Sequence, residues 1–217
     1  MRDRYNKELR ELNHELVEMG TLIEQAITVA ISALTNQDEQ AAQEVIAFDE
    51  EIDHQEKAIE TRCMKLILQQ QPVAGDLRVI SSALKMVTDM ERIGDHASDI
   101  GKLVLLLVGE SYILDIRNIR QMANETMDMV VKSIEAFVQK DQAMARWVIA
   151  HDDIVDDLFN TVKKELITLI NQDMACGEQA TDLLMAAKYF ERIGDHSVNI
   201  AEWVIYSLTG RHVKENR

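Results

Sequence analysis

The sequence predicts an all-α protein made of two tandem three-helix bundles, with six long helices related by an internal duplication. The chain contains a single proline, and only 5% of its residues are aromatic, a composition that favours long helices over sheets. Apolar residues recur every three or four positions over long stretches, as they do on one face of a helix. The segment Glu-Arg-Ile-Gly-Asp-His occurs twice, at residues 91–96 and 191–196. Such internal repetition is the strongest single indication of how a chain is organised.

The repeat extends well beyond the hexapeptide. Residues 45–53 match residues 148–156 at an offset of 103, whereas the hexapeptides are 100 residues apart. The shorter offset predicts a deletion of about three residues in the turn between the two matches. We therefore divide the chain into a first three-helix bundle over residues 1–110 and a second over residues 111–217.

The first half is predicted to contain helices over residues 4–34, 38–70 and 77–108. Asp38 is a plausible N-cap for the second of these helices. The segment 71–76 holds the only proline and predicts a turn, after which Asp76 could cap the third helix. Gly109 is expected to end that helix.

The second half repeats this plan. Helices are predicted over residues 116–139 and 141–171, and a last helix follows a turn at residues 174–177 and runs to about residue 208. Asp141 opens the second helix of this half, and Gly210 stops the last one. No flexible linker separates the halves, so we expect them to pack against each other.

Charge and apolar pattern exclude several classes of function. A formal net charge of −15 argues against a nucleic-acid partner and against adsorption to an anionic membrane. The longest strongly apolar run, residues 103–108, is far shorter than a membrane span, so we expect no spanning segment. The two cysteines form no disulfide framework or metal-binding pattern, and the expected location is the cytoplasm.

Acidic residues lie at the edge of the apolar stripe on several predicted helices. A turn of about 100° per residue places Glu91 roughly 40° outside the apolar arc, with Asp95 and Asp99 at successive steps of about 40°. The preceding helix carries an acidic pair at positions i and i+4 beside its own stripe. The same pattern occurs in both halves, in the pairs Asp49 with Asp53, Glu91 with Asp95, Asp152 with Asp156 and Glu191 with Asp195.

Carboxylates crowded at a partly buried seam repel one another and lose hydration, so they need a counter-charge. Divalent cations are one source, because hard ions prefer oxygen ligands. Arg92 and Arg192 are an alternative source, as ion-pair partners without metal. Gly94, in mid-helix, indicates that a neighbouring helix or ion comes close. His96 and His196 lie about 140° from their glutamates and are expected to face solvent or the other bundle.

We expect the protein not to be an enzyme. A carboxylate-bridged di-iron enzyme needs Glu-x-x-His pairs, whereas Glu91 and His96 are five residues apart. The sequence shows no nucleophile–base arrangement and no glycine loop of the kind that holds phosphates.

The sequence closely resembles the PhoU family of bacterial phosphate-transport regulators over nearly its whole length. The resemblance is carried by Gln-Pro-Val-Ala-Gly-Asp-Leu-Arg at residues 71–78, by the two Glu-Arg-Ile-Gly-Asp segments and by the Val-Ile-Ala-x-Asp stretches. It implies tandem three-helix bundles and a cytoplasmic regulator that restrains phosphate uptake and the phosphate-starvation response. The implied partners are the ATPase subunit of the phosphate ABC transporter and a membrane sensor histidine kinase, and a homodimer is possible.

The resemblance also implies clusters of divalent or trivalent metal ions, namely iron, zinc, manganese or magnesium. The implied ligands are Asp49, Asp53, Glu91, Asp95, Asp99, Asp152, Asp156, Glu191 and Asp195. Asn199 stands where the first copy has Asp99, so the second site has one acid fewer.

Two other functions stay open at this point. One is a metal-independent helical adaptor whose acids only form ion pairs, and the other is a metal-dependent hydrolase. We further expect that any phosphate binding requires metal, because so acidic a protein is a poor direct binder of phosphate.

Overall fold

The computed structural model describes residues 2–70 and 72–213, which form six α-helices and one short 3-10 helix, with no strand in those ranges. The helices are α1 (Arg2–Asn36), α2 (Glu39–Gln70), α3 (Ala74–Leu107), α4 (Arg117–Gln139), α5 (Gln142–Gln172) and α6 (Gly177–Thr209), and the 3-10 helix is Met174–Cys176. The predicted all-α class and the six-helix plan are confirmed.

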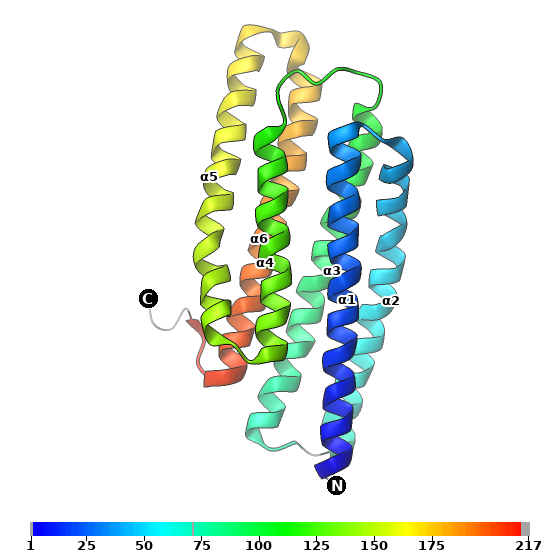
Figure 1. Cartoon of the computed structure of the whole chain (residues 1–217), viewed down its shortest axis with the longest axis vertical. Helices are drawn as coiled ribbons and strands as arrows, with labels where there is room; N and C mark the ends of the chain where they lie inside the picture. Colours follow the sequence, from blue (N-terminus) through cyan, green and yellow to red (C-terminus); the bar gives the residue numbers. More distant parts are fainter. Residues whose placement is uncertain (1, 71, 214–217) are drawn as a thin grey trace.

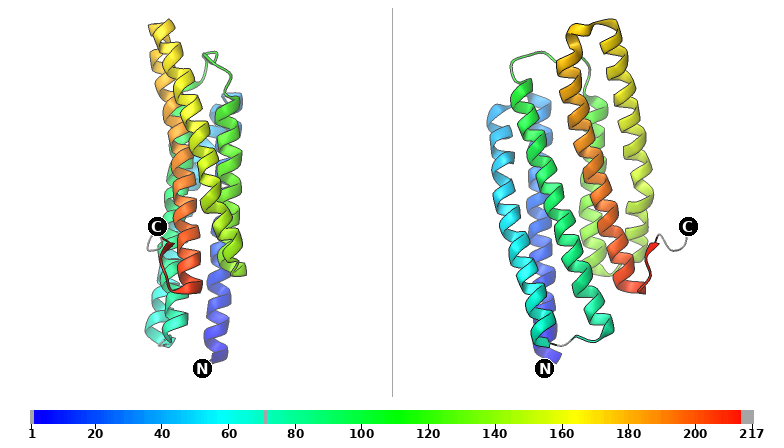
Figure 2. Two further views of the ribbon diagram at one scale, coloured as in Figure 1. Left: turned by 90° about the vertical axis from the view of Figure 1, so that its left-hand side faces the viewer. Right: turned by 180° about the vertical axis from the view of Figure 1, so that it is seen from behind.

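Two three-helix bundles lie side by side along their length. In Figure 1 the chain runs up α1, down α2 and up α3, and then crosses over the top to run down α4, up α5 and down α6. Helices α3 and α6 pack against each other, as do α1 and α4, so both contacts join the halves. Helices α2, α3, α6 and α5 lie next to one another in one layer, and α1 and α4 pack together on one face of that layer (Figure 2). The halves therefore pack directly, as expected.

Local residue chemistry accounts for the helix ends. The Asp38 carboxylate accepts a hydrogen bond from the Ala41 amide at 3.1 Å, and the Asp141 carboxylate accepts from the amides of Ala143 and Met144 at 2.8 and 3.0 Å. Both aspartates are the N-caps that the sequence predicts. Gly210 ends α6 with φ of 73°, a left-handed conformation that favours glycine.

The start of the third helix differs from the prediction. Helix α3 begins at Ala74, three residues before the predicted start at Leu77. Its N-cap is Val73, which makes no side-chain capping bond, so the prediction of Asp76 as the cap is wrong. Pro72 lies just before the cap, and Asp76 instead sits in the first turn, where a negative charge favours the helix dipole. Gln71, in the predicted turn, lies outside the described residues.

The core is a single apolar cluster that runs through both halves. Glycines allow the helices of the first half to approach closely. A Cβ at Gly94 would lie 2.7 Å from Cδ1 of Ile52 on α2, and one at Gly101 would lie 2.3 Å from Cγ1 of Val45. The expectation that a neighbouring helix comes close at Gly94 is thus confirmed, and this contact draws the acidic edges of α2 and α3 together.

One stretch, Tyr5–Asn36, is long and apolar enough to cross a membrane by length and composition alone. Half of its most apolar window is buried within the bundle, and core helices of soluble proteins pass the same test. The absence of a membrane span stays a prediction.

Candidate functional site

The first acidic seam lies between α2 and α3 and contains Asp49, Asp53 and Glu56 from α2 and Glu91 and Asp95 from α3. All five side chains are half-buried. The Asp49 carboxyl lies within hydrogen-bonding reach of Asp95 across the seam, and Glu91 lies in the electrostatic field of Asp53 and Glu56. The structure therefore brings together four of the five acids predicted for this pair of helices, the exception being Asp99.

Burial and mutual repulsion perturb the first acidic seam. Loss of hydration, followed by the charge of Asp95, raises the pKa of Glu91 to about 7. Burial and the proximity of Asp95 also raise the pKa of Asp49. Arg92 supplies part of the counter-charge, with contacts of 3.4 Å to Glu91 and 2.7 Å to Asp95. Its guanidinium is more than half exposed, so these ion pairs offset the repulsion only in part.

The second acidic seam lies between α5 and α6 and contains Asp152 and Asp156 from α5 and Glu191 and Asp195 from α6. Burial, and then the charges of Asp156 and Asp195, raise the pKa of Asp152 to about 6. The would-be Cβ position of Gly194 is 3.3 Å from an Asp152 oxygen, which shows how closely the helices approach here. The Lys188 ammonium contacts both carboxylate oxygens of Glu191 at 2.5 Å.

Three residues differ from the predicted pattern. Asp99 pairs with Lys102 at 2.9 Å and lies within hydrogen-bonding reach of Tyr189 of the other half, so its partners are residues outside the first acidic seam. Glu56 and Lys188 belong to the seams but were not predicted. Each could have been found from helical spacing, because Glu56 lies three residues after Asp53 and Lys188 three residues before Glu191.

The donor chemistry of both seams fits a hard metal ion. Several carboxylate oxygens face one another in each seam, and their raised pKa values show that a positive charge placed between them would be stabilised. As the side chains stand, however, no three Asp, Glu, His or Cys residues in the described ranges are arranged to hold a metal ion. In this arrangement Arg92 and Lys188 pair with carboxylates of the first and second seam respectively.

A further polar cluster lies between the halves, where α3 meets α6. The rings of His96 and His196 face each other with centroids 5.5 Å apart. Nδ1 of His196 lies 2.8 Å from Oδ1 of Asp89, and the Asn199 amide donates to the same oxygen at 3.1 Å. His96 and His196 were expected to face either solvent or the other bundle, and each faces the other bundle.

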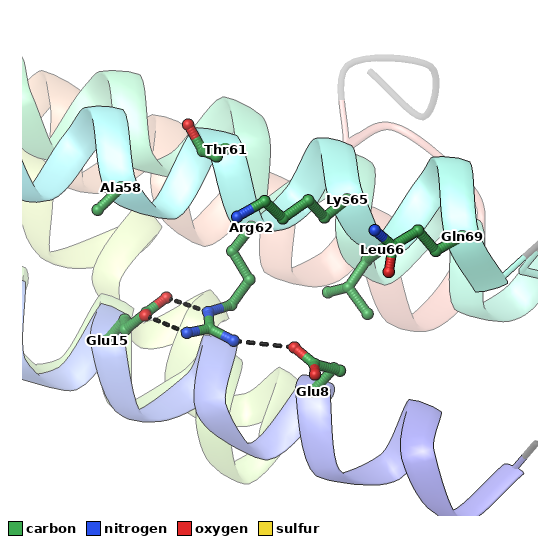
Figure 3. A pocket seen from close by; sticks show the side chains of 8 residues that line it. All are labelled: Glu8, Glu15, Ala58, Thr61, Arg62, Lys65, Leu66 and Gln69. Carbon is green, nitrogen blue, oxygen red and sulfur yellow. Dashed lines mark hydrogen bonds and ion pairs between the residues drawn. The ribbon is translucent and has the colours of Figure 1, made fainter.

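A separate cavity of about 470 Å³ lies between α1 and α2 (Figure 3). Its centre is Arg62, whose guanidinium donates two hydrogen bonds to Glu15 at 2.5 and 2.6 Å and one to Glu8 at 2.9 Å. All three donor nitrogens of Arg62 are thus engaged within the chain. This arrangement cross-links two helices and engages three of the five N–H donors of the guanidinium.

Comparison with known proteins shows one consistent likeness. A family model described as the PhoU domain matches residues 16–104 and, a second time, residues 119–204. A protein of Clostridium acetobutylicum named phosphate-specific transport system accessory protein PhoU homolog is 39% identical over 213 residues, covering 98% of this chain and 97% of its own. A protein of the same name from Aquifex aeolicus is 39% identical over 208 residues, covering 96% and 94%.

Solved structures show the same likeness. The crystal structure of PhoU from Pseudomonas aeruginosa superposes with a TM-score of 0.91 at 35% identity and covers 95% of this chain and 100% of that one. The phosphate transport system regulatory protein PhoU from Streptococcus pneumoniae superposes with a TM-score of 0.89 at 28% identity, covering 96% and 99%.

Proposed function

The chain belongs to the PhoU family, and from this membership we propose that it is a cytoplasmic regulator of phosphate uptake and phosphate homeostasis. In this role it restrains the phosphate ABC transporter, through the ATPase subunit, and the phosphate-sensing two-component system, through the membrane histidine kinase. The observation that carries the proposal is likeness over almost the full length, in both repeats, to proteins named as accessories of phosphate-specific transport. The proposed role is regulatory and includes no enzymatic reaction.

Deletion of the gene in its host tests this role. In phosphate-rich medium we expect the deletion strain to take up labelled phosphate faster and to express phosphate-starvation promoters, and the wild-type gene on a plasmid should reverse both effects. Unchanged uptake and silent promoters would contradict the proposal. Co-purification from mild-detergent extracts should recover the ATPase subunit and the kinase, and light scattering would test the proposed homodimer.

We propose further that both acidic seams bind metal ions, either divalent or trivalent, with iron, zinc, manganese and magnesium as candidates. Asp49, Asp53, Glu91 and Asp95 would hold ions in the first seam, with Asp99 at its edge, and Asp152, Asp156, Glu191 and Asp195 in the second. A bound cation would supply positive charge among oxygen donors that now repel one another. The raised pKa values of Glu91 and Asp152 support this proposal.

Elemental analysis of protein purified without added metal, and without a polyhistidine tag, tests metal binding. We expect bound metal in the wild type and a lower content in the double variant Glu91→Ala with Asp95→Ala, in which the second seam is intact. If both proteins are metal-free and the wild type still restrains phosphate uptake, the metal-independent adaptor is the correct function. A screen of phosphate esters with added manganese or zinc would detect the third candidate, a hydrolase.

Any phosphate binding should depend on these ions, because the chain carries a net charge of −15. Titration calorimetry should show phosphate binding to the metal-loaded protein and at least tenfold weaker binding after chelation. Equal affinity before and after chelation would contradict this dependence.

A further inference from the structure

The duplicated motif has a second face that the acidic seams do not use. Within each hexapeptide the acids point toward the neighbouring helix of the same half, whereas the final histidine points toward the other half. His96 on α3 and His196 on α6 are therefore equivalent residues that meet across the boundary between the repeats, with ring centroids 5.5 Å apart and ring planes inclined by 36°.

The surroundings of the two histidines differ. His196 has a carboxylate partner, because its Nδ1 lies 2.8 Å from Oδ1 of Asp89. The residue equivalent to Asp89 in the second copy is Tyr189, whose ring stacks on His96 at 5.5 Å and offers it no carboxylate. Asn199 also donates to Asp89 and helps to hold it in place.

We propose that His96 and His196 bind one transition-metal ion of the zinc, nickel or copper class at the boundary between the repeats. This site adjoins the second acidic seam, whose Asp152 and Asp195 line the same cavity, but its ligands are different residues. It does not depend on the proposed function. A tetrahedral metal bound to one nitrogen from each of two imidazoles at about 2.0–2.1 Å holds their ring centres roughly 5 Å apart. The observed separation of 5.5 Å is close to that value, so the two rings lie at a distance that one metal ion can bridge.

His96 has the properties of a ligand without a partner. The residue is 8% exposed, and its buried Nδ1 has no hydrogen-bond partner among the residues that the structure describes. An imidazole nitrogen that carries no proton has the lone pair that metal binding requires.

His196 complements His96. A histidine that binds metal through one nitrogen generally makes a hydrogen bond to a carboxylate or carbonyl through the other, which fixes the ring and increases its basicity. Asp89 makes this contact at Nδ1 and leaves Nε2 available for the metal. Imidazole nitrogens favour zinc, nickel and copper, whereas the carboxylates of the seams favour harder ions, so the two kinds of site would select different metals.

A cavity of about 590 Å³, lined by both histidines together with Asn199 and Arg192, provides access. It has room for water molecules to complete the coordination shell. The charge of Arg192 opposes a cation there, but Asp195 and Asp152 line the same cavity and offset that charge.

The test uses untagged full-length protein that has been stripped with a chelator. Electron paramagnetic resonance with one equivalent of Cu²⁺ should show hyperfine splitting from two imidazole nitrogens. Zinc calorimetry should show one site that weakens at least tenfold in His96→Phe and in His196→Phe, both of which keep a planar ring. His151→Phe is the matched control, because His151 also stacks on an aromatic ring, that of Trp147, at 4.1 Å. It should leave zinc affinity unchanged.

Asp152→Asn combined with Asp195→Asn separates this site from the second acidic seam. If the double variant removes the zinc site while the histidine variants keep it, the metal is bound in the seam and the proposal is wrong. Unchanged zinc affinity in His96→Phe or His196→Phe would also overturn it. Circular dichroism melts identify any variant that does not fold. If the histidine variants do not fold, the copper spectrum of the wild type still tests the site, because fewer than two coupled nitrogens would reject it.

Discussion

Replacing Glu91 by Gln should stabilise the metal-free protein at alkaline pH, although it removes a charged partner of Arg92. Glutamine has the same shape as glutamate but carries no charge. In the first acidic seam Glu91 faces Asp95 and is 15% exposed, so its ionised form is destabilised by lost hydration and by repulsion. The ion pair with Arg92 opposes this effect, but Arg92 is more than half exposed and the closest contact of that pair is 3.4 Å.

The magnitude follows from the pKa of Glu91, which rises from an ordinary value of 4.5 to about 7 in the folded protein. A raised pKa means that the folded state holds the proton more tightly than the unfolded state does. Stability therefore falls as pH rises from about 4.5 to about 7, and the full penalty is present above that range. The shift corresponds to at most about 3 kcal/mol, and solvent screening reduces this to about 1–2 kcal/mol.

Urea unfolding at pH 5 and pH 8, with a chelator present, measures the effect. At pH 8 Glu91→Gln should raise the free energy of unfolding by about 1–2 kcal/mol, equivalent to a rise of about 2–4 °C in Tm, and at pH 5 the gain should shrink to a few tenths. Glu44→Gln, at an exposed position on α2, is the control and should change stability little at either pH. A variant less stable than the wild type at pH 8 would show that the Arg92 ion pair outweighs the repulsion, and the reasoning would fail.

Two further predictions concern packing and cross-links. Gly94→Ala should destabilise the fold by about 1–3 kcal/mol in chemical denaturation, because the new Cβ would lie 2.7 Å from Ile52. The control Gly75→Ala should be neutral or stabilising, because no atom lies within 4 Å of the Cβ position there. Equal effects would show that Ile52 moves aside freely. Arg62→Met should lose about 1–2 kcal/mol, because it breaks the hydrogen bonds to Glu15, and thermal melts in 1 M salt should show a smaller loss.

Much of the fold could be predicted because it depends on periodicity and repetition. Apolar spacing predicts every helix. Asp38 and Asp141 act as the predicted caps because their carboxylates accept hydrogen bonds from backbone amides that have no partner within the helix. The start of α3 was placed three residues late because Pro72 and Gly75 both signal a turn. Gly75 is instead the second residue of α3, so it does not carry the cost of a glycine in a helix interior.

The acidic seams could be predicted only in part. Angles around a helix place Glu91 and Asp95 at the border of the apolar stripe, and the structure confirms that they meet Asp49 of the next helix. The angular positions of residues around one helix do not predict which side chains of a neighbouring helix reach them, or in which rotamer. The pairing of Lys188 with Glu191, and the turning of Asp99 toward Tyr189, therefore required the coordinates. Metal binding in the seams stays a prediction.

The two halves have a polar contact between their first and second helices at the same place, but different residue types make it. In the first half Arg62 on the second helix donates to Glu15 on the first, and at the equivalent place in the second half Glu165 accepts from the amide of Asn118 at 3.0 Å. Both halves have this cross-link, but the acid is on the first helix in one half and on the second helix in the other, where a neutral amide replaces the arginine. The seams diverge in the same way, since their neutralising cation is Arg92 on one side and Lys188 on the other. A guanidinium that pairs with two acids and an ammonium that pairs with one differ in geometry and hydration. We therefore expect the two seams to differ in affinity for any cation, although four of their carboxylates are equivalent.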